Sequence, residues 1–218
     1  MRAHRAWWHL TAGLMAVGLI AVGRPASTSA GVQLTVEHVQ PSSAVADPRT
    51  GRLFVASPGA VAGSNGRVAM FSARTAQLLQ TTSVGYNPIA MALDGRTQRL
   101  FVVNQATLDA VGSPTGQGSV SMLDAQTGAS LRTVKVGRMP RAVAVDEQTR
   151  RVFVVNYQDG TVSMLDALLG HVLRTVAVGP QPRLVAVDLS SNRTFIVKAD
   201  GALRVLDATT GVMLRSVP

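Results

Sequence analysis

Apolar and polar residues alternate in short runs along most of the chain. The clearest runs are RAVAVD (141–146), RVFVVN (151–156), TVSMLD (161–166) and LRTVAV (173–178). Short runs of period two that are rich in β-branched residues are typical of β-strands. Asp and Gly stand between the runs and favour tight hairpins, because Gly adopts positive φ and Asp accepts hydrogen bonds from nearby backbone. Residues 140–179 therefore predict a four-stranded antiparallel meander of about 40 residues.

The same unit recurs along the chain with regular marks. Each unit opens with a proline (Pro41, Pro88, Pro140 and Pro182). Its first strand ends in an aspartate (Asp47, Asp94, Asp146 and Asp188). Its second strand contains a phenylalanine (Phe54, Phe101, Phe153 and Phe195). All three marks recur at intervals of 47, 52 and 42 residues. One such sheet cannot bury both faces, whereas sheets stacked radially bury each other. We therefore expect an all-β protein, a β-propeller whose four-stranded antiparallel blades span about 41–87, 88–139, 140–181 and 182–218.

Three features carry a family resemblance. FVVN occurs at 101–104 and 153–156, VSMLD at 120–124 and 162–166, and a Val-Gly pair precedes the proline at the unit junctions. These motifs resemble the YVTN-type β-propeller repeat of the YncE-like extracytoplasmic proteins, over about residues 32–218. FVAS (54–57) and FIVK (195–198) depart from the pattern, because they lack the Asn. The resemblance implies a seven-bladed ring but no particular activity, because propellers have many unrelated functions.

Four units do not complete a seven-bladed ring, and an open arc would expose two apolar sheet faces. Three explanations stay open. In order of preference, they are further blades after residue 218, a homodimer of arcs if the chain is complete, and a small four-bladed ring.

The first 30 residues differ from the repeats. Arg2, His4 and Arg5 begin the chain, a mostly apolar run covers 7–22, and small residues lead to Ala30. This order is typical of a secretory signal peptide, and the apolar run is short for a membrane span. We expect cleavage after Ala30 and export to the periplasm, the cell surface or the medium, with an uncleaved N-terminal anchor as the alternative. The chain has no cysteine, which excludes a lipoprotein anchor and a disulfide.

The acidic residues argue against a catalytic centre. Most of them recur once per unit at turns, where Asp stabilises the backbone, whereas acid–base catalysis and metal binding need acids that converge on one point. His38 and His171 are the only histidines after residue 30, and no G-x-S-x-G motif is present. The sequence therefore predicts no catalytic residues, no metal site and no cofactor. The enzymatic alternative is a lactonase-like or cofactor-dependent propeller whose active site is completed by missing blades.

The candidate ligand site lies on the loops. The connections between second and third strands vary most in length, and the unit junctions on the same face contain several arginines. The candidate residues are Asn104, Asn156, Arg138, Arg141, Arg183, Tyr86 and Tyr157. We expect them at the mouth of the central channel. The structural alternative is that the loops are merely tolerant of change and that the two Asn residues cap turns.

The charge suggests the partner. The formal net charge of +9 falls to +6 after removal of residues 1–30, which contain three arginines and no acidic residue. A positive excess favours anionic partners, such as single-stranded nucleic acid or a phosphate-rich envelope polymer. The function expected from the sequence is an exported, non-enzymatic scaffold that binds a ligand or a protein at this loop face.

Overall fold

The computed structural model describes residues 40–61, 63–106 and 115–218. The predicted signal peptide (1–30), His38 and Asp109 lie outside these ranges. No membrane-spanning helix is found in the part of the chain that the structure describes.

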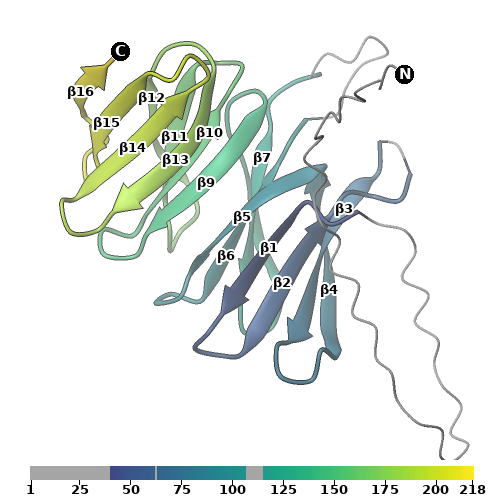
Figure 1. The fold of residues 1–218 in the computed structure, drawn as a ribbon. Helices are drawn as coiled ribbons and strands as arrows, with labels where there is room; N and C mark the ends of the chain where they lie inside the picture. Colours follow the sequence, from purple (N-terminus) through teal and green to yellow (C-terminus); the bar gives the residue numbers. More distant parts are fainter. Residues whose placement is uncertain (1–39, 62, 107–114) are drawn as a thin grey trace, which may run out of the picture. The chain divides into compact units, whose positions relative to one another are not determined.

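The described chain forms four sheets of four antiparallel strands (Figure 1), which confirms the predicted all-β fold with four blades. The first sheet contains β1 (Ser43–Asp47), β2 (Arg52–Ser57), β3 (Asn65–Ser72) and β4 (Leu78–Tyr86). The second contains β5 (Pro88–Asp94), β6 (Arg99–Asn104), β7 (Ser119–Asp124) and β8 (Ser130–Lys135). The third contains β9 (Pro140–Asp146), β10 (Arg151–Asn156), β11 (Thr161–Asp166) and β12 (Val172–Ala177). The fourth contains β13 (Pro182–Asp188), β14 (Arg193–Lys198), β15 (Leu203–Asp207) and β16 (Met213–Val217).

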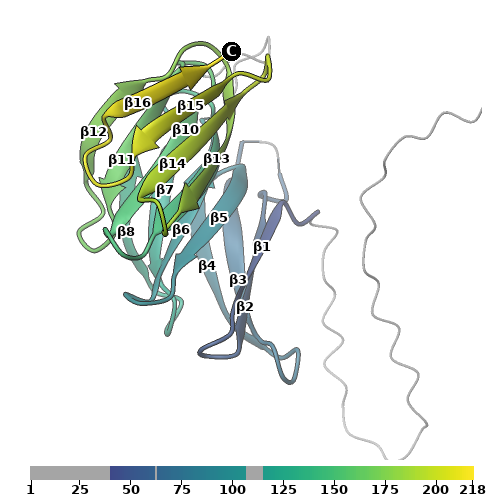
Figure 2. The ribbon, with the colours of Figure 1, turned by 60° about the vertical axis from the view of Figure 1, so that its left-hand side comes forward.

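Within each sheet the strands lie side by side in chain order, as Figures 1 and 2 show from two directions. The first strands of successive sheets, β1, β5, β9 and β13, contact one another in turn. The two ends of these first strands therefore have different neighbours. In β5, β9 and β13 the first residue lies at the junction with the preceding sheet, and in all four strands the last residue enters the hairpin to the second strand.

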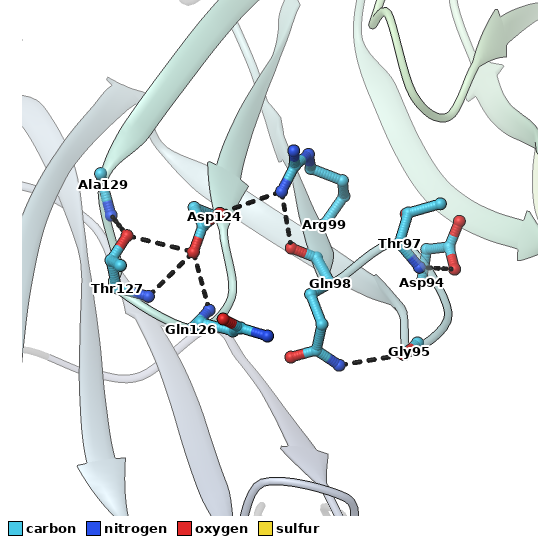
Figure 3. A network of polar contacts seen from close by, with 9 residues as sticks. All are labelled: Asp94, Gly95, Thr97, Gln98, Arg99, Asp124, Gln126, Thr127 and Ala129. Carbon is cyan, nitrogen blue, oxygen red and sulfur yellow. Dashed lines mark hydrogen bonds and ion pairs between the residues drawn. The ribbon is translucent and has the colours of Figure 1, made fainter.

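The repeated aspartates hold the hairpin turns, as the sequence predicts. Asp94 Oδ1 accepts hydrogen bonds from the backbone N–H groups of Arg96 at 2.9 Å and Thr97 at 3.0 Å. Asp124 does the same for the turn between the third and fourth strands, and its second oxygen lies 3.0 Å from the Arg99 guanidinium (Figure 3). Burial raises the pKa of Asp124, but these hydrogen bonds and Arg99 outweigh it and leave the pKa below its ordinary value.

Three clusters of buried apolar side chains join the successive sheets. In each cluster, the repeated Phe of one sheet packs against aliphatic residues in the second and third strands of the next sheet. The pairs are Phe54 with Leu100 and Leu123, Phe101 with Val152 and Leu165, and Phe153 with Ile196 and Leu206. These three Phe side chains are at most 1% exposed. Burial of such a side chain is worth about 1.5–3 kcal/mol, so the junctions provide much of the stability.

The fourth repeated Phe has a different environment. Phe195 belongs to none of the buried clusters of the described residues and is half-buried. Leu184 lies on the neighbouring strand opposite Val197, the next residue on this face of β14, and is 60% exposed. The face of β14 that matches the junction faces of β2, β6 and β10 is therefore only partly covered.

Candidate functional site

The first strands of the second, third and fourth sheets share an irregularity at their start. In β9, Pro140 lies opposite Asn156 and Ala142 lies opposite Val155, so Arg141 is an extra residue without a partner across the ladder. The same shift in β5 and β13 leaves Ile89 and Arg183 as the extra residues. Such β-bulges change the direction of a side chain and occur often beside functional sites. The bulges therefore place two arginines at equivalent positions on neighbouring strands.

Arg141 is held by an aromatic ring. Its guanidinium carbon lies 4.1 Å from the centre of the Tyr157 ring, in a cation–π contact worth about 0.5–1 kcal/mol at an exposed site. The backbone N–H of Tyr157 donates to the Met139 carbonyl at 3.0 Å, which fixes the loop that follows β10. Among the described residues, the Arg141 side chain makes no hydrogen bond or ion pair. Its N–H donors are therefore available to a ligand.

Arg138 is already paired. Its Nε lies 2.6 Å from Asp159 Oδ1, and its backbone N–H donates to Asp159 Oδ2 at 2.8 Å. Burial raises the pKa of Asp159, but the hydrogen bonds from Arg138 outweigh it and leave the pKa below its ordinary value. Asp159 therefore stays ionised at neutral pH and offsets the positive charge of Arg138. Asp159 stands in an Asp-Gly turn, and no pattern along the chain reveals its pairing with Arg138.

Arg183 and Tyr86 lie at other junctions. Arg183 is exposed and has no hydrogen bond or ion pair among the described residues. Its strand, β13, contacts β9, which carries Arg141. Tyr86 ends β4, opposite Asn65, and is half-buried at the junction of the first two sheets. The structure therefore brings Arg141 together with Tyr157 and places Arg183 on the adjacent strand, with Tyr86 at a separate junction.

Asn104 and Asn156 are fully buried. Asn156 Nδ2 donates to Thr161 Oγ1 at 3.0 Å and to Ser163 Oγ at 2.9 Å, and its Oδ1 accepts from the Gly137 N–H at 3.1 Å. A Cβ at Gly137 would lie 2.6 Å from Asn156 Cγ, so only glycine leaves room for this amide. A Cβ at Gly85 would likewise lie 2.7 Å from Asn104 Cγ, but Asn104 Nδ2 donates to Ser119 Oγ and Ser121 Oγ of its own sheet, and its Oδ1 has no hydrogen-bond partner among the described residues. Asn156 thus joins the second strand of its sheet to the preceding junction by a hydrogen bond, whereas Asn104 only packs against that junction.

Lys198 replaces the Asn in the fourth sheet. It lies opposite Pro182, as Asn156 lies opposite Pro140, and it is only 6% exposed. Its Nζ pairs with Asp200 Oδ2 at 2.8 Å. The hydrogen bond from Lys198 is the main cause that lowers the pKa of Asp200. The departure of FIVK from the repeat is the sequence signal for this difference.

We define the bulge site as Arg141, Tyr157 and Arg183. It offers two guanidinium groups without carboxylate partners among the described residues and one aromatic face. In the described ranges, no group of three or more His, Cys, Asp or Glu side chains is placed to hold a metal ion. The two guanidinium groups of the bulge site can donate hydrogen bonds to a negatively charged group.

Residues 5–211 match the family model described as the choice-of-anchor I domain. The chain belongs to this family. The family description indicates a cell-surface or exported protein. No curated protein matches the sequence.

Solved structures support the same fold for this choice-of-anchor I domain. It is similar to the hydrazine synthase of Kuenenia stuttgartiensis, with a TM-score of 0.66 and 17% identity, over 88% of this chain and 52% of that chain. It is also similar to U3-55K and to the WD40 repeats of RRP9, each with a TM-score of 0.61 and 14% identity, over 81% of this chain and 51% of the other. The domain thus spans about half the length of these chains. The comparisons show a β-propeller fold but do not single out the YVTN-type family.

Proposed function

We propose that this choice-of-anchor I domain is a non-enzymatic binding scaffold, exported to the cell surface or beyond, that recognises an anionic polymer at the bulge site. The observation that carries the proposal is the pair of bulged arginines, Arg141 and Arg183, on neighbouring first strands. The proposal includes cleavage after Ala30, a YVTN-type repeat and further blades that complete a seven-bladed ring. Arg138 and Asn156 hold the chain beside this site, whereas Asn104 and Tyr86 lie at the junction of the first two sheets.

The two arginines suit a ligand that carries repeated negative charges. Each guanidinium presents several N–H donors in one plane, which match the oxygens of a phosphate group. Tyr157 covers one side of Arg141 and limits its motion, so that less side-chain entropy is lost on binding. Phosphates in a polymer recur at short spacing, so two neighbouring strands can each engage one.

The affinity should be modest and sensitive to salt. Binding of a phosphate polymer releases condensed counterions, which makes the affinity fall as salt rises. Stacking of bases on aromatic side chains normally strengthens single-strand binding, and here Tyr157 is already occupied by Arg141. A phosphate-rich envelope polymer and a single-stranded nucleic acid share the chemistry that this site recognises.

The test is fluorescence anisotropy with a labelled oligothymidylate, and with inorganic polyphosphate as competitor, at about 50 mM and about 200 mM NaCl. Replacing Arg141→Gln and Arg183→Gln together should weaken binding at least about tenfold and reduce the salt slope by about 1.4, since each single-strand phosphate contact contributes about 0.7. The matched control is Arg132→Gln with Arg174→Gln, which removes two exposed arginines from the fourth strands β8 and β12. Equal affinities for the two double variants would refute the proposal.

A further inference from the structure

A second cationic feature lies at the other end of the first strands. A hollow of about 340 Å³, partly open to solvent, lies between the hairpin turns β5–β6 and β9–β10. It is lined by Arg96, Thr97, Glu147, Gln148 and Arg150, all of them polar. We refer to it as the hairpin cavity. The bulge site lies at the start of β9, whereas the hairpin cavity lies beyond its last residue, Asp146, so the two features are separate.

The turns around the hairpin cavity have a fixed backbone. Asp146 Oδ1 accepts hydrogen bonds from the N–H groups of Gln148 at 2.8 Å and Thr149 at 3.0 Å, in the same way that Asp94 holds its own turn. Arg150 adopts a left-handed conformation with φ of 56°, where the turn passes into β10. Both turns are thus ordered before any ligand binds, which lowers the entropic cost of recognition.

Glu147 is the only acidic residue that lines the cavity, and its carboxylate is already engaged. Its Oε1 accepts from the Gly95 N–H at 2.8 Å, and its Oε2 lies 3.6 Å from Arg49 Nη2. Glu147 thereby connects the turns of three successive sheets. Arg49 adds a third positive charge beside this single carboxylate, so Arg49, Arg96 and Arg150 outnumber the acid and leave a positive excess around the cavity.

Both cavity arginines keep donors for a ligand. Arg96 Nη1 donates to the Glu147 carbonyl oxygen at 3.3 Å, which anchors the guanidinium beside the cavity and leaves its other N–H groups unused. The Arg150 side chain makes no hydrogen bond or ion pair among the described residues. Arg96 comes from one hairpin and Arg150 from the next, so an oxygen-rich anion between them would bridge two sheets.

We propose that the hairpin cavity binds a small phosphate-bearing molecule through Arg96 and Arg150. A phosphate group offers several acceptor oxygens to two planar guanidinium groups, which is the geometry that arginine recognises best. Ligand pockets typically start near 300 Å³, so the cavity has room for a phosphate with a small organic group. Thr97 and Gln148 add neutral hydrogen-bonding groups for that organic part.

The experiment is isothermal titration calorimetry of the full chain, at low ionic strength, with inorganic phosphate and separately with ribose 5-phosphate. The Arg96→Gln, Arg150→Gln double variant should weaken binding of both probes at least about tenfold, by loss of two charge-assisted contacts. Glu147→Gln should strengthen binding several-fold, since Gln keeps an acceptor for Gly95 and removes the only negative charge of the lining. A higher affinity for ribose 5-phosphate assigns the site to phosphate esters, and equal affinities assign it to free phosphate.

Two controls separate this site from the proposed function. In the Arg141→Gln, Arg183→Gln background, which removes the bulge site, the phosphate binding that remains should still be lost on adding Arg96→Gln with Arg150→Gln, whatever the effect on the oligonucleotide. Thermal unfolding followed by circular dichroism should give the same Tm for all variants within a few degrees. No heat of binding to the wild type, or an unchanged affinity in the Arg96→Gln, Arg150→Gln variant, would overturn the inference.

Discussion

Replacement of Asn156 tests whether this residue joins two parts of the structure or contacts a ligand. The expected loss in the free energy of unfolding can be worked out from its hydrogen bonds. The Asn156→Ala variant loses the hydrogen bonds to Thr161, Ser163 and Gly137 at once. Ser163 and Gly137 are buried, so water cannot replace the lost partner at either group. Thr161 is half-buried and regains a partner from water more easily.

The magnitude follows from the groups left without a partner. A buried polar group that loses its partner costs about 1–3 kcal/mol. Two such groups give a loss of about 2–4 kcal/mol, because the Ser163 hydroxyl can rotate toward another acceptor. With a urea dependence of about 2 kcal/mol per molar, the unfolding midpoint should fall by about 1–2 M.

The assay is urea unfolding of the wild type and the variant, followed by far-ultraviolet circular dichroism. Gln158→Ala is the matched control, because Gln158 is exposed two residues further along, and it should change the free energy of unfolding by less than about 0.5 kcal/mol. The reasoning is refuted if Asn156→Ala matches this control in stability. A loss of oligonucleotide affinity in the folded variant would show that this joint positions the bulge site.

Three further expectations concern packing, pH and assembly. Phe153→Ala should destabilise the protein by about 3–5 kcal/mol in the same urea assay, and Phe195→Ala by clearly less, because only Phe153 is fully buried; equal losses would contradict the junction packing. The hydroxyls of Ser190 and Ser191 lower the pKa of Asp188 to about 2, so the stability that wild type gains over Asp188→Asn should be present above about pH 4 and disappear toward about pH 2; a difference that is independent of pH would contradict this. The partly covered face around Leu184 should make the isolated chain associate, so light scattering should give a mass above 22.8 kDa that Leu184→Glu reduces, whereas a monomeric wild type would count against it.

The architecture was predictable because the sequence repeats it. Each Phe is a large apolar residue at a fixed distance from a turn-forming Asp, and both marks keep their intervals through all four units. A strand that places Phe on one face also places Val and Leu on the other, so the packing of successive sheets follows from a period of two. The burial of the outer faces of the first and last sheets depends on what packs against them, and no pattern inside the repeat specifies that partner.

The candidate site was predictable only in part. Arg141 and Arg183 follow the proline that opens a unit, and this position alone does not reveal that they are bulged. A bulge is a shift of register between two strands, and a pattern read along one strand carries no information on that shift. Arg138 and Arg141 stand close together in the sequence at the same junction. Only Arg138 is paired with a carboxylate, because a loop brings Asp159 against it.

For the two asparagines and for the hairpin cavity, contacts from another sheet change the interpretation that sequence position favours. Asn104 and Asn156 stand beside loops of variable length, which favours a binding interpretation, yet glycines at the preceding junctions let their amides enter the interior. Arg96 and Arg150 stand in short turns, which favours a purely structural interpretation, yet Glu147 is held by Arg49 and Gly95 and leaves them without a carboxylate. In both cases the decisive contact comes from a different sheet. Both proposed sites therefore lie at junctions between repeats, where residues of two or three units meet.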